Sequence, residues 1–316
     1  TNMDDVDVAM AGEPSAIKSL LHTQWKQKDF SFFDTEKYGT MTVMPKWESV
    51  KYEITPFRTE TTYSDGRHPD EVVWSSSLRD DSQRRDFTIN ALYYTVVKVN
   101  EGLKAWEKSS KDKNTSYIFD ADSQTLVIND ADSIKYWSDS DESFTDFVIS
   151  YIDHFALSVT GDTLRVIVDP QGGIADLVDG KIRAVGSADA RFGEDALRLI
   201  RALRFVIGLN HGWDHGFDIE KTTWKSLKKN SHLIRQVAKE RIKQELDKVF
   251  LWHNPFGFIS LLDETNILKR LFPRLHTNKH VDQPVRYHPF DVFTHSMLVL
   301  YQMQWLSDDP ILRYAA

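Results

Sequence analysis

The sequence contains no cysteine and no hydrophobic run of the length that crosses a bilayer. Without cysteine, disulfides and thiolate metal sites are excluded, so we expect a cytoplasmic protein with no disulfide-linked partner. The most apolar stretch, FVISYIDHFALSV at 147–159, is short and contains Asp153 and His154, which indicates burial in protein rather than in a membrane. The sequence also lacks a secretory signal, an internal repeat and a low-complexity tract. These absences predict a soluble globular protein.

The composition limits the class of protein further. The 316 residues are 41% hydrophobic and 27% charged, and the net charge is −8. This length suggests two or three domains, and the negative charge argues against a protein that coats nucleic acid indiscriminately. The charge is uneven, however, because residues 100–162 are acidic and residues 221–245 are basic. The basic segment could still hold a phosphate backbone.

The hydrophobic pattern changes along the chain. The period-two segment at 5–10 predicts a strand, and so do the segments at 39–45 and 51–58, which are rich in threonine, valine and aromatic residues, whereas AIKSLLHTQW at 16–25 predicts a helix. From Phe192 onward the patterns are helical. We therefore expect an α/β head followed by an all-helical remainder. The acidic stretch contains Trp106 and Trp137, so we expect it to fold as an insertion rather than to serve as a bare linker.

The segment DVDVAM places two carboxylates two residues apart, at Asp5 and Asp7. On a strand this spacing puts both on one face. Close carboxylates repel unless a cation lies between them, and their oxygens suit Mg²⁺. Glu53, on a second predicted strand, could add a third carboxylate. The alternative is a strand edge that exposes these acids to water, and the residues by themselves favour this alternative.

The segment GEDALRLIRALRFV, at 193–206, predicts one amphipathic helix with an apolar face and a charged face. Its basic residues are all arginine, which suits bidentate contacts with phosphates or bases. Asp195 and Arg198 are neighbours at i,i+3, and Glu194 and Arg198 at i,i+4. A surface helix with salt bridges is the alternative.

A paired aspartate and arginine also have a definite recognition chemistry. Cytosine and adenine both present an amino donor beside a ring-nitrogen acceptor. Asp195 could accept from the amino group while Arg198 donates to the ring nitrogen. With uracil or guanine, neither Asp195 nor Arg198 would form its hydrogen bond. A substrate that leaves such buried groups unpaired binds poorly and is rejected.

Taken in order, several segments resemble the class II tRNA nucleotidyltransferases, the CCA-adding enzymes, and the related bacterial poly(A) polymerases. The resemblance rests on DVDVAM, on YGTMTV, YEITPFR and YSDGRHPDEV, on RRDFTINAL at 84–92, on DPQGGIADL at 169–177, on FGEDALRLIRALRF and on ERIKQEL at 240–246. Together these segments span most of the chain outside the acidic insertion.

The resemblance implies an α+β fold: a polymerase-β-like nucleotidyltransferase head with a mixed sheet and helices, then an all-helical neck and body. The expected domains are the head at 1–180 with the insertion at about 100–163, the neck at 181–250, and the body with the start of an HD-like domain at 251–316. The implied activity is template-independent addition of C and A nucleotides to the tRNA 3′ end from CTP and ATP. The basic segment at 221–243, with Arg235 and Lys239, would hold the acceptor stem by its phosphates.

The resemblance also assigns roles to individual residues. Asp5 and Asp7 would be catalytic and would bind two Mg²⁺ ions. Arg85 would contact the incoming nucleotide, and Asp86 and Asn90 would support its ribose or the loop around it. The base would face a set on the arginine-rich helix, namely Asp195, Arg198, Arg201 and Arg204. Arg84 receives no role beyond facing water or RNA.

Three departures from the family pattern stand out. The Gly-Gly-x-Val-Arg-Asp segment that holds the triphosphate is absent. Because the chain starts without an initiator methionine and stops within a helical pattern, we interpret it as a piece of a longer protein. The acidic insertion is the second departure. The third is RYHPFDVFTHSMLVL, which resembles the opening of an HD domain in which His288, Asp291 and His295 could share a face, although such residues more often cap a helix.

Three alternatives remain open. A poly(A) polymerase, or an enzyme adding only CC or only A, would share these motifs. A phosphohydrolase of the HD type with a degenerate head would need a further His-Asp pair. A non-catalytic tRNA-binding protein would not need Asp5, Asp7 and Arg85.

Overall fold

The chain forms two compact units in the computed structural model. The described residues are 5–26, 28–35, 39–47, 49–60, 72–75, 77–98, 117–120, 125–128, 155–160, 163–212, 216–251, 254–284, 286 and 289–316. Unit 1 combines Thr1–Thr62, Pro69–Arg85 and Ala91–Gln171, and unit 2 combines Tyr63–His68, Asp86–Asn90 and Gly172–Ala316. The motif RRDFTINAL therefore contributes to both units, because the chain passes between them at Arg85 and again at Asn90. The domain boundaries at 180 and 250 stay predictions.

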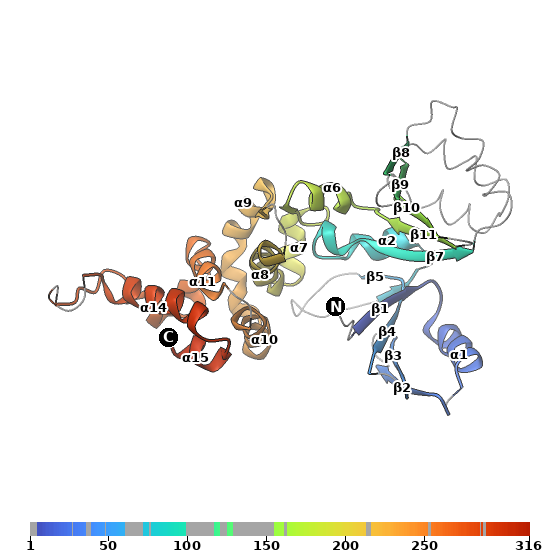
Figure 1. Cartoon of the computed structure of the whole chain (residues 1–316), viewed down its shortest axis with the longest axis horizontal. Helices are drawn as coiled ribbons and strands as arrows, with labels where there is room; N and C mark the ends of the chain where they lie inside the picture. Colours follow the sequence, from blue (N-terminus) through green and yellow to red (C-terminus); the bar gives the residue numbers. More distant parts are fainter. Residues whose placement is uncertain are drawn as a thin grey trace. The chain divides into compact units, whose positions relative to one another are not determined.

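Unit 1 begins with a mixed four-stranded sheet (Figure 1). Its strands are β1 (Asp5–Met10), β2 (Phe30–Thr35), β3 (Thr40–Pro45) and β4 (Lys51–Pro56), in the order β1-β4-β3-β2. The β1–β4 pair is parallel and the other two pairs are antiparallel. Helix α1 (Pro14–Gln24) covers the sheet with Ile17 and Leu21, which pack on Met41, Val43 and Ile54. The expected mixed sheet of the head is thus present.

The remainder of unit 1 holds a short hairpin, a short helix and a second sheet. Strands β5 (Arg58–Glu60) and β6 (Val72–Trp74) pair, and α2 (Leu78–Gln83) begins at Ser77, whose hydroxyl accepts the Asp80 N–H. The second sheet is antiparallel, with the order β7-β11-β10-β9-β8. Its strands are β7 (Tyr93–Lys98), β8 (Tyr117–Asp120), β9 (Thr125–Ile128), β10 (Phe155–Thr160) and β11 (Thr163–Val168). The segment expected as an insertion therefore contributes β8, β9 and β10 to a sheet that β7 and β11 begin.

Unit 2 is helical around a single large core. Its main helices are α7 (Ala188–Glu194), α8 (Leu197–Gly212), α9 (Lys221–Asn230), α10 (Lys239–Phe250), α11 (Pro255–Glu264) and α14 (Val292–Leu306). Shorter elements are η2 (Thr88–Asn90), α6 (Gly173–Val178), η4 (Ser231–Gln236), α12 (Leu268–Leu271), α13 (Pro273–His276) and α15 (Pro310–Ala315). Strands β12 (Lys181–Ile182) and β13 (Asp218–Ile219) form one small parallel pair. Helix α8 lies at the centre, where Leu199, Ile200 and Leu203 are fully buried.

The single helix predicted at 193–206 is wrong in one respect, because the helix is interrupted at Asp195. The backbone of Asp195 is extended (φ −144°, ψ 104°), so α7 ends at Glu194 and α8 begins at Leu197. The Asp195 carboxylate accepts the Leu197 N–H at 3.0 Å, as a cap at a helix start does. The apolar face is as predicted, since Ala196, Leu199, Ile200, Leu203 and Val206 are buried.

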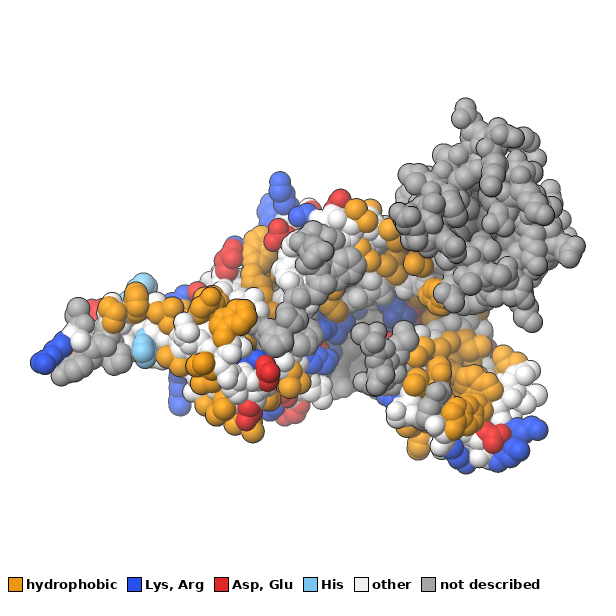
Figure 2. Space-filling view, in the orientation of Figure 1, with side chains coloured by type: hydrophobic (Ala, Val, Ile, Leu, Met, Phe, Trp, Pro, Cys, Tyr) orange, Lys and Arg blue, Asp and Glu red, His pale blue; other side chains and the backbone are white. Residues whose placement is uncertain are grey.

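The C-terminal helices of unit 2 present apolar side chains at the surface. Trp305, Leu306 and Ile311 are 68%, 76% and 73% exposed. Figure 2 shows hydrophobic side chains gathered over α14 and α15. A helix that is apolar around most of its circumference is typical of one packed on several sides.

Among the described residues, none of the helices combines the length and the apolar character that a membrane crossing requires.

Candidate functional site

The carboxylates of unit 1 lie along the parallel pair β1–β4. Asp7 is in register with Glu53, and Asp5 with Lys51. Residues paired in this way project from the same face of a sheet, so the backbone brings Asp5, Asp7 and Glu53 to one face. Asp7 is exposed, and Glu53 binds the ammonium group of Lys51. The side chain of Asp5 lies outside the described residues, and the side chains that are described form no group of three metal-binding residues.

In α2, a buried carboxylate organises the double arginine, and sequence reasoning missed it. Asp81 accepts from Arg84 Nε at 2.8 Å, from Arg85 Nη2 at 2.8 Å and from the Tyr93 hydroxyl at 2.7 Å. Burial alone would raise the pKa of the Asp81 carboxyl, but Arg84 and Arg85 outweigh it and hold that pKa below its usual value. The expectation that Arg84 only faces water or RNA is wrong. The signal for Asp81 was its spacing of three and four residues from the two arginines that directly follow this short helix.

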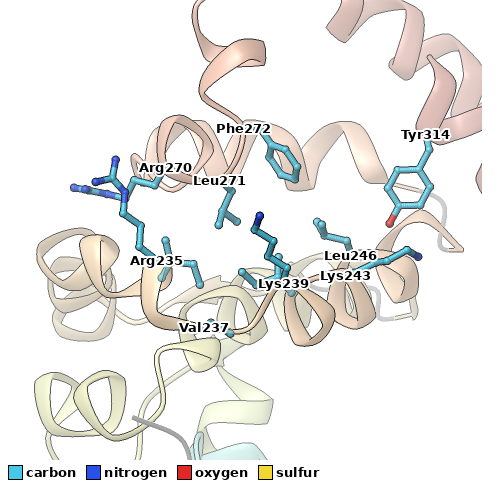
Figure 3. Close-up of a pocket in the computed structure, with 11 residues that line it drawn as sticks. Arg235, Val237, Lys239, Lys243, Leu246, Arg270, Leu271, Phe272 and Tyr314 are labelled. Atoms are coloured by element: carbon cyan, nitrogen blue, oxygen red, sulfur yellow. The ribbon is translucent and has the colours of Figure 1, made fainter. Parts of the chain in front are cut away.

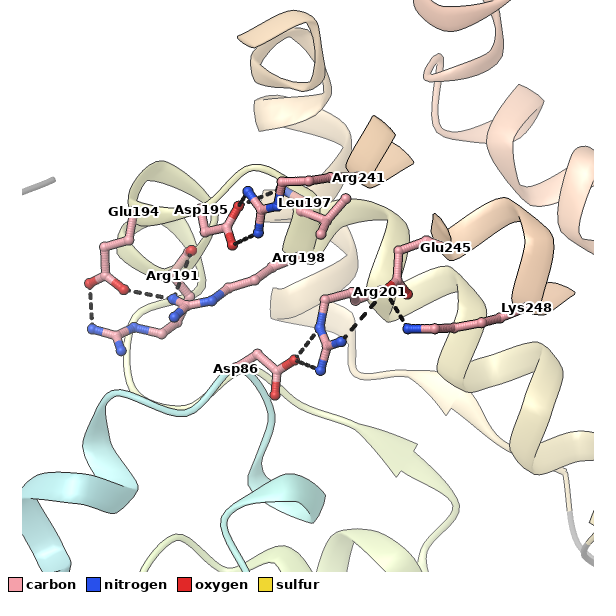
Figure 4. Close-up of polar contacts among 10 residues, drawn as sticks. All are labelled: Asp86, Arg191, Glu194, Asp195, Leu197, Arg198, Arg201, Arg241, Glu245 and Lys248. Carbon is pink, nitrogen blue, oxygen red and sulfur yellow. Dashed lines mark hydrogen bonds and ion pairs between the residues drawn. The ribbon is translucent and has the colours of Figure 1, made fainter. Parts of the chain in front are cut away.

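Asp86 binds Arg201, an arginine of α8. One of its oxygens accepts from the Phe87 N–H and from Asn90 Nδ2 at 2.9 and 3.0 Å. The other accepts from Arg201 Nε at 2.7 Å (Figure 4). Burial opposes ionisation, yet Arg201 and then Asn90 keep the pKa of Asp86 below its usual value. Asp86, Asn90 and Arg201, all predicted site residues, therefore form one hydrogen-bonded group.

The junction between α7 and α8 pairs its charges differently from the prediction. Arg198 Nη1 donates to Glu194 Oε2 at 2.6 Å and to the Arg191 carbonyl at 3.1 Å. Asp195 forms two hydrogen bonds with Arg241 of α10, at 2.7 and 3.1 Å (Figure 4). The Glu194–Arg198 pair at i,i+4 was expected from the spacing. The carboxylate of Asp195 instead binds Arg241, since the break in the helix takes Asp195 out of helical register with Arg198.

Arg204 is buried rather than exposed on a polar face. It is 8% exposed, its Nε lies 2.5 Å from Glu245 Oε2, and its guanidinium lies over the Phe205 ring. Glu245 also accepts from Lys248 at 2.9 Å and lies 3.9 Å from Arg201. A buried arginine needs such a counter-charge, and it comes from α10. Sequence reasoning quoted ERIKQEL but gave no role to Arg241 or Glu245, whose i,i+4 spacing puts both on one helix face.

The predicted RNA-binding cations differ in their surroundings. Lys228, Lys229 and Lys243 form ion pairs with Glu264, Asp189 and Asp247. Arg235 and Lys239 line a cavity of unit 2 together with Lys243 and Arg270. The segment at 221–243 is therefore only partly available as a cationic surface.

The HD-like segment contains a helix cap. Asp291 accepts the backbone N–H groups of Thr294 and His280, at 2.6 and 2.8 Å, at the start of α14. This matches the expectation that such residues cap a helix. His288 lies outside the described residues.

Comparison with known proteins matches both units to one family. Residues 1–109 match the model of the poly(A) polymerase head domain, and residues 216–279 match that of a probable RNA- and SrmB-binding site of polymerase A. The chain is 30% identical over 267 residues to the CCA-adding enzyme of Leuconostoc citreum, covering 84% of this chain and 46% of that protein. It is 32% identical over 265 residues to the CCA-adding enzyme of Ligilactobacillus salivarius, covering 84% and 45%. The chain belongs to the CCA-adding enzyme and poly(A) polymerase family.

The fold agrees with this family. The structure resembles the CCA-adding enzyme of Thermotoga maritima, solved in complex with a tRNA, with a TM-score of 0.54 and 18% identity over 98% of this chain and 50% of that one. The chain spans about half the length of the curated relatives it matches. Within the family matches, the head-domain region contains Asp5, Asp7, Glu53 and Arg85, and the RNA-binding region contains Arg235, Arg241 and Glu245.

Proposed function

We propose that this chain is the nucleotidyltransferase part of an enzyme that adds C and A nucleotides to the 3′ end of tRNA, using CTP and ATP and releasing pyrophosphate. The observation that carries the proposal is the identity of 30% and 32% to curated CCA-adding enzymes over 84% of the chain. The supporting features are the carboxylates on β1 and the arginines held in place around α8.

Asp5 and Asp7 are the residues that we propose as ligands of Mg²⁺, in a two-metal site. They fit this ion because carboxylate oxygens two residues apart on one strand face are hard donors, and Asp7 is open to solvent. Bound Mg²⁺ would lower the pKa of the attacking terminal hydroxyl and neutralise charge on the departing pyrophosphate. Lys51 neutralises Glu53 beside this pair and limits repulsion among the carboxylates.

Arg85 is the residue that we propose to contact the phosphate or sugar of the incoming nucleotide. Asp81 and Tyr93 hold its guanidinium, so little side-chain entropy is lost on binding. Asp86 and Asn90 would shape the loop around the ribose, since their mutual hydrogen bond and the Asp86–Arg201 pair fix that loop to α8. Preorganised groups of this kind supply positioning, which accounts for much of the catalysis of phosphoryl transfer.

Asp195 and Arg198 are proposed to read the base, with Arg201 and Arg204 beside them. In the structure, Arg241 and Glu194 occupy the groups that the base would engage. Base recognition would then be an exchange of partners: the amino group of C or A replaces Arg241 at Asp195, and the ring nitrogen replaces Glu194 at Arg198. Uracil and guanine lack this donor and acceptor order and would not compensate for the broken ion pairs.

Incubation of the full-length protein with tRNA lacking its terminal CCA, with CTP, ATP and Mg²⁺, tests the activity. We expect incorporation of C and then A, and an absence of both would refute the proposal. Asp5→Ala should abolish transfer while tRNA binding persists, and the control Glu13→Ala, an exposed acid of the same unit, should keep activity. Product length on a sequencing gel separates CCA addition from poly(A), CC or A addition.

Base selection has its own test in the ratio of CTP to UTP incorporation. We expect Arg198→Lys to lower this ratio about 10- to 100-fold, because a charge-assisted hydrogen bond contributes about 1.5–3 kcal/mol. The control Lys225→Gln, an exposed cation of α9, should leave it unchanged. If the wild-type protein uses UTP as well as CTP, the role of Asp195 and Arg198 is wrong even where the activity stands.

A further inference from the structure

Unit 2 contains a cavity of about 740 Å³ whose lining joins apolar walls to cations. It lies among η4, α10, α12 and α15, and its volume falls in the range of about 300–1,000 Å³ that is typical of small-ligand sites. All of its lining residues except Tyr314 belong to the region 216–279. No acidic side chain is among the lining residues that the structure describes. The cavity therefore favours a ligand that combines an apolar part with negative charge.

Lys243 of this cavity forms an ion pair with Asp247, but the other three cations that line it lack such a counter-charge among the described residues. Within the described part of the chain, no hydrogen bond or ion pair holds the side chains of Arg235 and Lys239, and the buried Nε of Arg270 has no hydrogen-bond partner. Figure 3 shows the guanidinium groups of Arg235 and Arg270 at one end of the view, with Lys239 pointing between the walls. Unpaired guanidinium groups at one place are suited to bidentate contact with a phosphate.

An aromatic side chain stands at the opposite end of the cavity. Tyr314 stacks on Phe250 with ring centroids 3.9 Å apart, and its hydroxyl donates to Asp247 at 3.0 Å. These contacts fix the ring, which is 44% exposed and lines the cavity. Asp247, the acid near this end, is already engaged by Lys243 and Tyr314. A fixed, half-open aromatic ring is a platform on which a nucleobase can stack.

We propose that this cavity binds one unpaired nucleotide of the RNA substrate, with its base against Tyr314 and Phe272 and its phosphate at Arg235 and Arg270. This inference rests on the proposed function and adds to it a site that recognises an unstacked base rather than the backbone alone. Single-stranded RNA is commonly recognised in this way, by aromatic stacking together with basic residues.

The experiment compares the binding of two RNAs to the full-length protein in the absence of CTP and ATP. One is a fluorescein-labelled hairpin with a two-nucleotide unpaired 3′ end, and the other is identical except that the two unpaired positions are abasic. Fluorescence anisotropy gives the dissociation constants. We expect the wild-type protein to bind the first RNA about tenfold more tightly, as a stacked base contributes. If the wild-type protein binds the two RNAs with equal dissociation constants, that result alone overturns the proposal.

Substitutions then locate the site. Tyr314→Leu should remove the difference between the two RNAs, whereas Tyr301→Leu, a residue of α14 with a similar exposure of 40%, should preserve it. Arg270→Gln and Arg235→Gln should weaken both RNAs and reduce the salt dependence by about one phosphate contact each, unlike the control Arg274→Gln on α13. Thermal unfolding verifies that each variant folds, and Arg235→Gln, at an exposed position, still tests the phosphate contact if Tyr314→Leu does not fold.

The outcomes separate this site from the proposed activity. If the protein adds C and A but binds both RNAs with equal affinity, the base pocket is refuted and the proposed function stands. If the protein binds the two RNAs with different affinities but transfers no nucleotide, only the proposed function is refuted. If an acidic apolar peptide binds the wild-type protein, Tyr314→Leu abolishes that binding, and RNA binding is unaffected, then the cavity is a protein-docking site and the RNA proposal is wrong.

Discussion

Two aspartates five residues apart serve different units of this protein. Asp81 holds Arg84, Arg85 and Tyr93 in unit 1, and Asp86 holds Asn90 and Arg201 in unit 2. Both are buried carboxylates whose pKa stays below its usual value because arginines outweigh burial. At the scale of single residues, the arrangement of the candidate site therefore depends on which carboxylate each arginine binds. Differences of a few ångströms in side-chain position decide this pairing.

Gly173 illustrates the same dependence on close approach. A Cβ at this position would lie 2.3 Å from the carbonyl oxygen of Thr88, so α6 and η2 pack too closely for any other residue. We expect Gly173→Ala to lower the free energy of unfolding by about 1–3 kcal/mol, as overpacking does. The control Gly193→Ala, in α7 with no atom within 4 Å of the added Cβ, should be neutral or slightly stabilising. Urea unfolding measures both, and equal effects would contradict the packing argument.

At the scale of elements, helix ends determine where the candidate site side chains lie. Asp195 interrupts a continuous amphipathic pattern, because it caps α8 while Arg241 holds its carboxylate. Asp291 similarly begins α14 by accepting N–H groups from Thr294 and His280. In both cases a carboxylate that could have been a ligand instead satisfies backbone donors at a helix start.

The cap at Asp291 predicts a pH dependence. Hydrogen bonds from Thr294, and then from His280, lower the pKa of the Asp291 carboxyl from 3.8 to about 2. A lowered pKa stabilises the folded state above the unfolded-state pKa, and this contribution is lost as the pH falls from about 4 to about 2. We expect Asp291→Asn to be less stable than the wild type at neutral pH, with a deficit that shrinks across this window. The control Asp282→Asn, an exposed loop residue, should show no such trend in urea unfolding.

At the scale of the whole molecule, the two units have separate hydrophobic cores. The core of unit 1 at its first sheet contains Ile17, Leu21, Met41, Val43 and Ile54, and the core of unit 2 is centred on α8. The two clusters share no residue. The proposed division of labour follows the same line, with the carboxylates on the sheet of unit 1 and the base-reading arginines in unit 2.

Separate cores predict separate unfolding transitions. Val43→Ala and Leu199→Ala each remove methyl groups from a fully buried position, in unit 1 and unit 2 respectively. We expect each to destabilise its own unit by about 2–4 kcal/mol and to shift one calorimetric transition while the other stays in place. A single transition displaced by both substitutions would mean that the units unfold together.

The sequence by itself determined the family and the order of the elements, and it supplied the residues that we propose for the site. The threonine- and valine-rich composition indicated β3, and a period of 3.6 indicated α8, and both elements bury one face. The spacing of Asp5 and Asp7 placed both on one strand face, and the i,i+4 spacing of Glu194 and Arg198 was enough to predict their ion pair. These are local relations, carried by backbone geometry over a few residues.

Only the tertiary structure decided the partners across distant segments. Arg241 reaches Asp195 from 46 residues away, and Arg201 reaches Asp86 from 115 residues away. No periodicity encodes such pairs, because they depend on how helices pack around the core. The burial of Arg204 follows from the same packing, since Glu245 lies opposite it on α10. Local backbone geometry predicted which side chains are candidates for the site, and tertiary packing determined which residues they pair with.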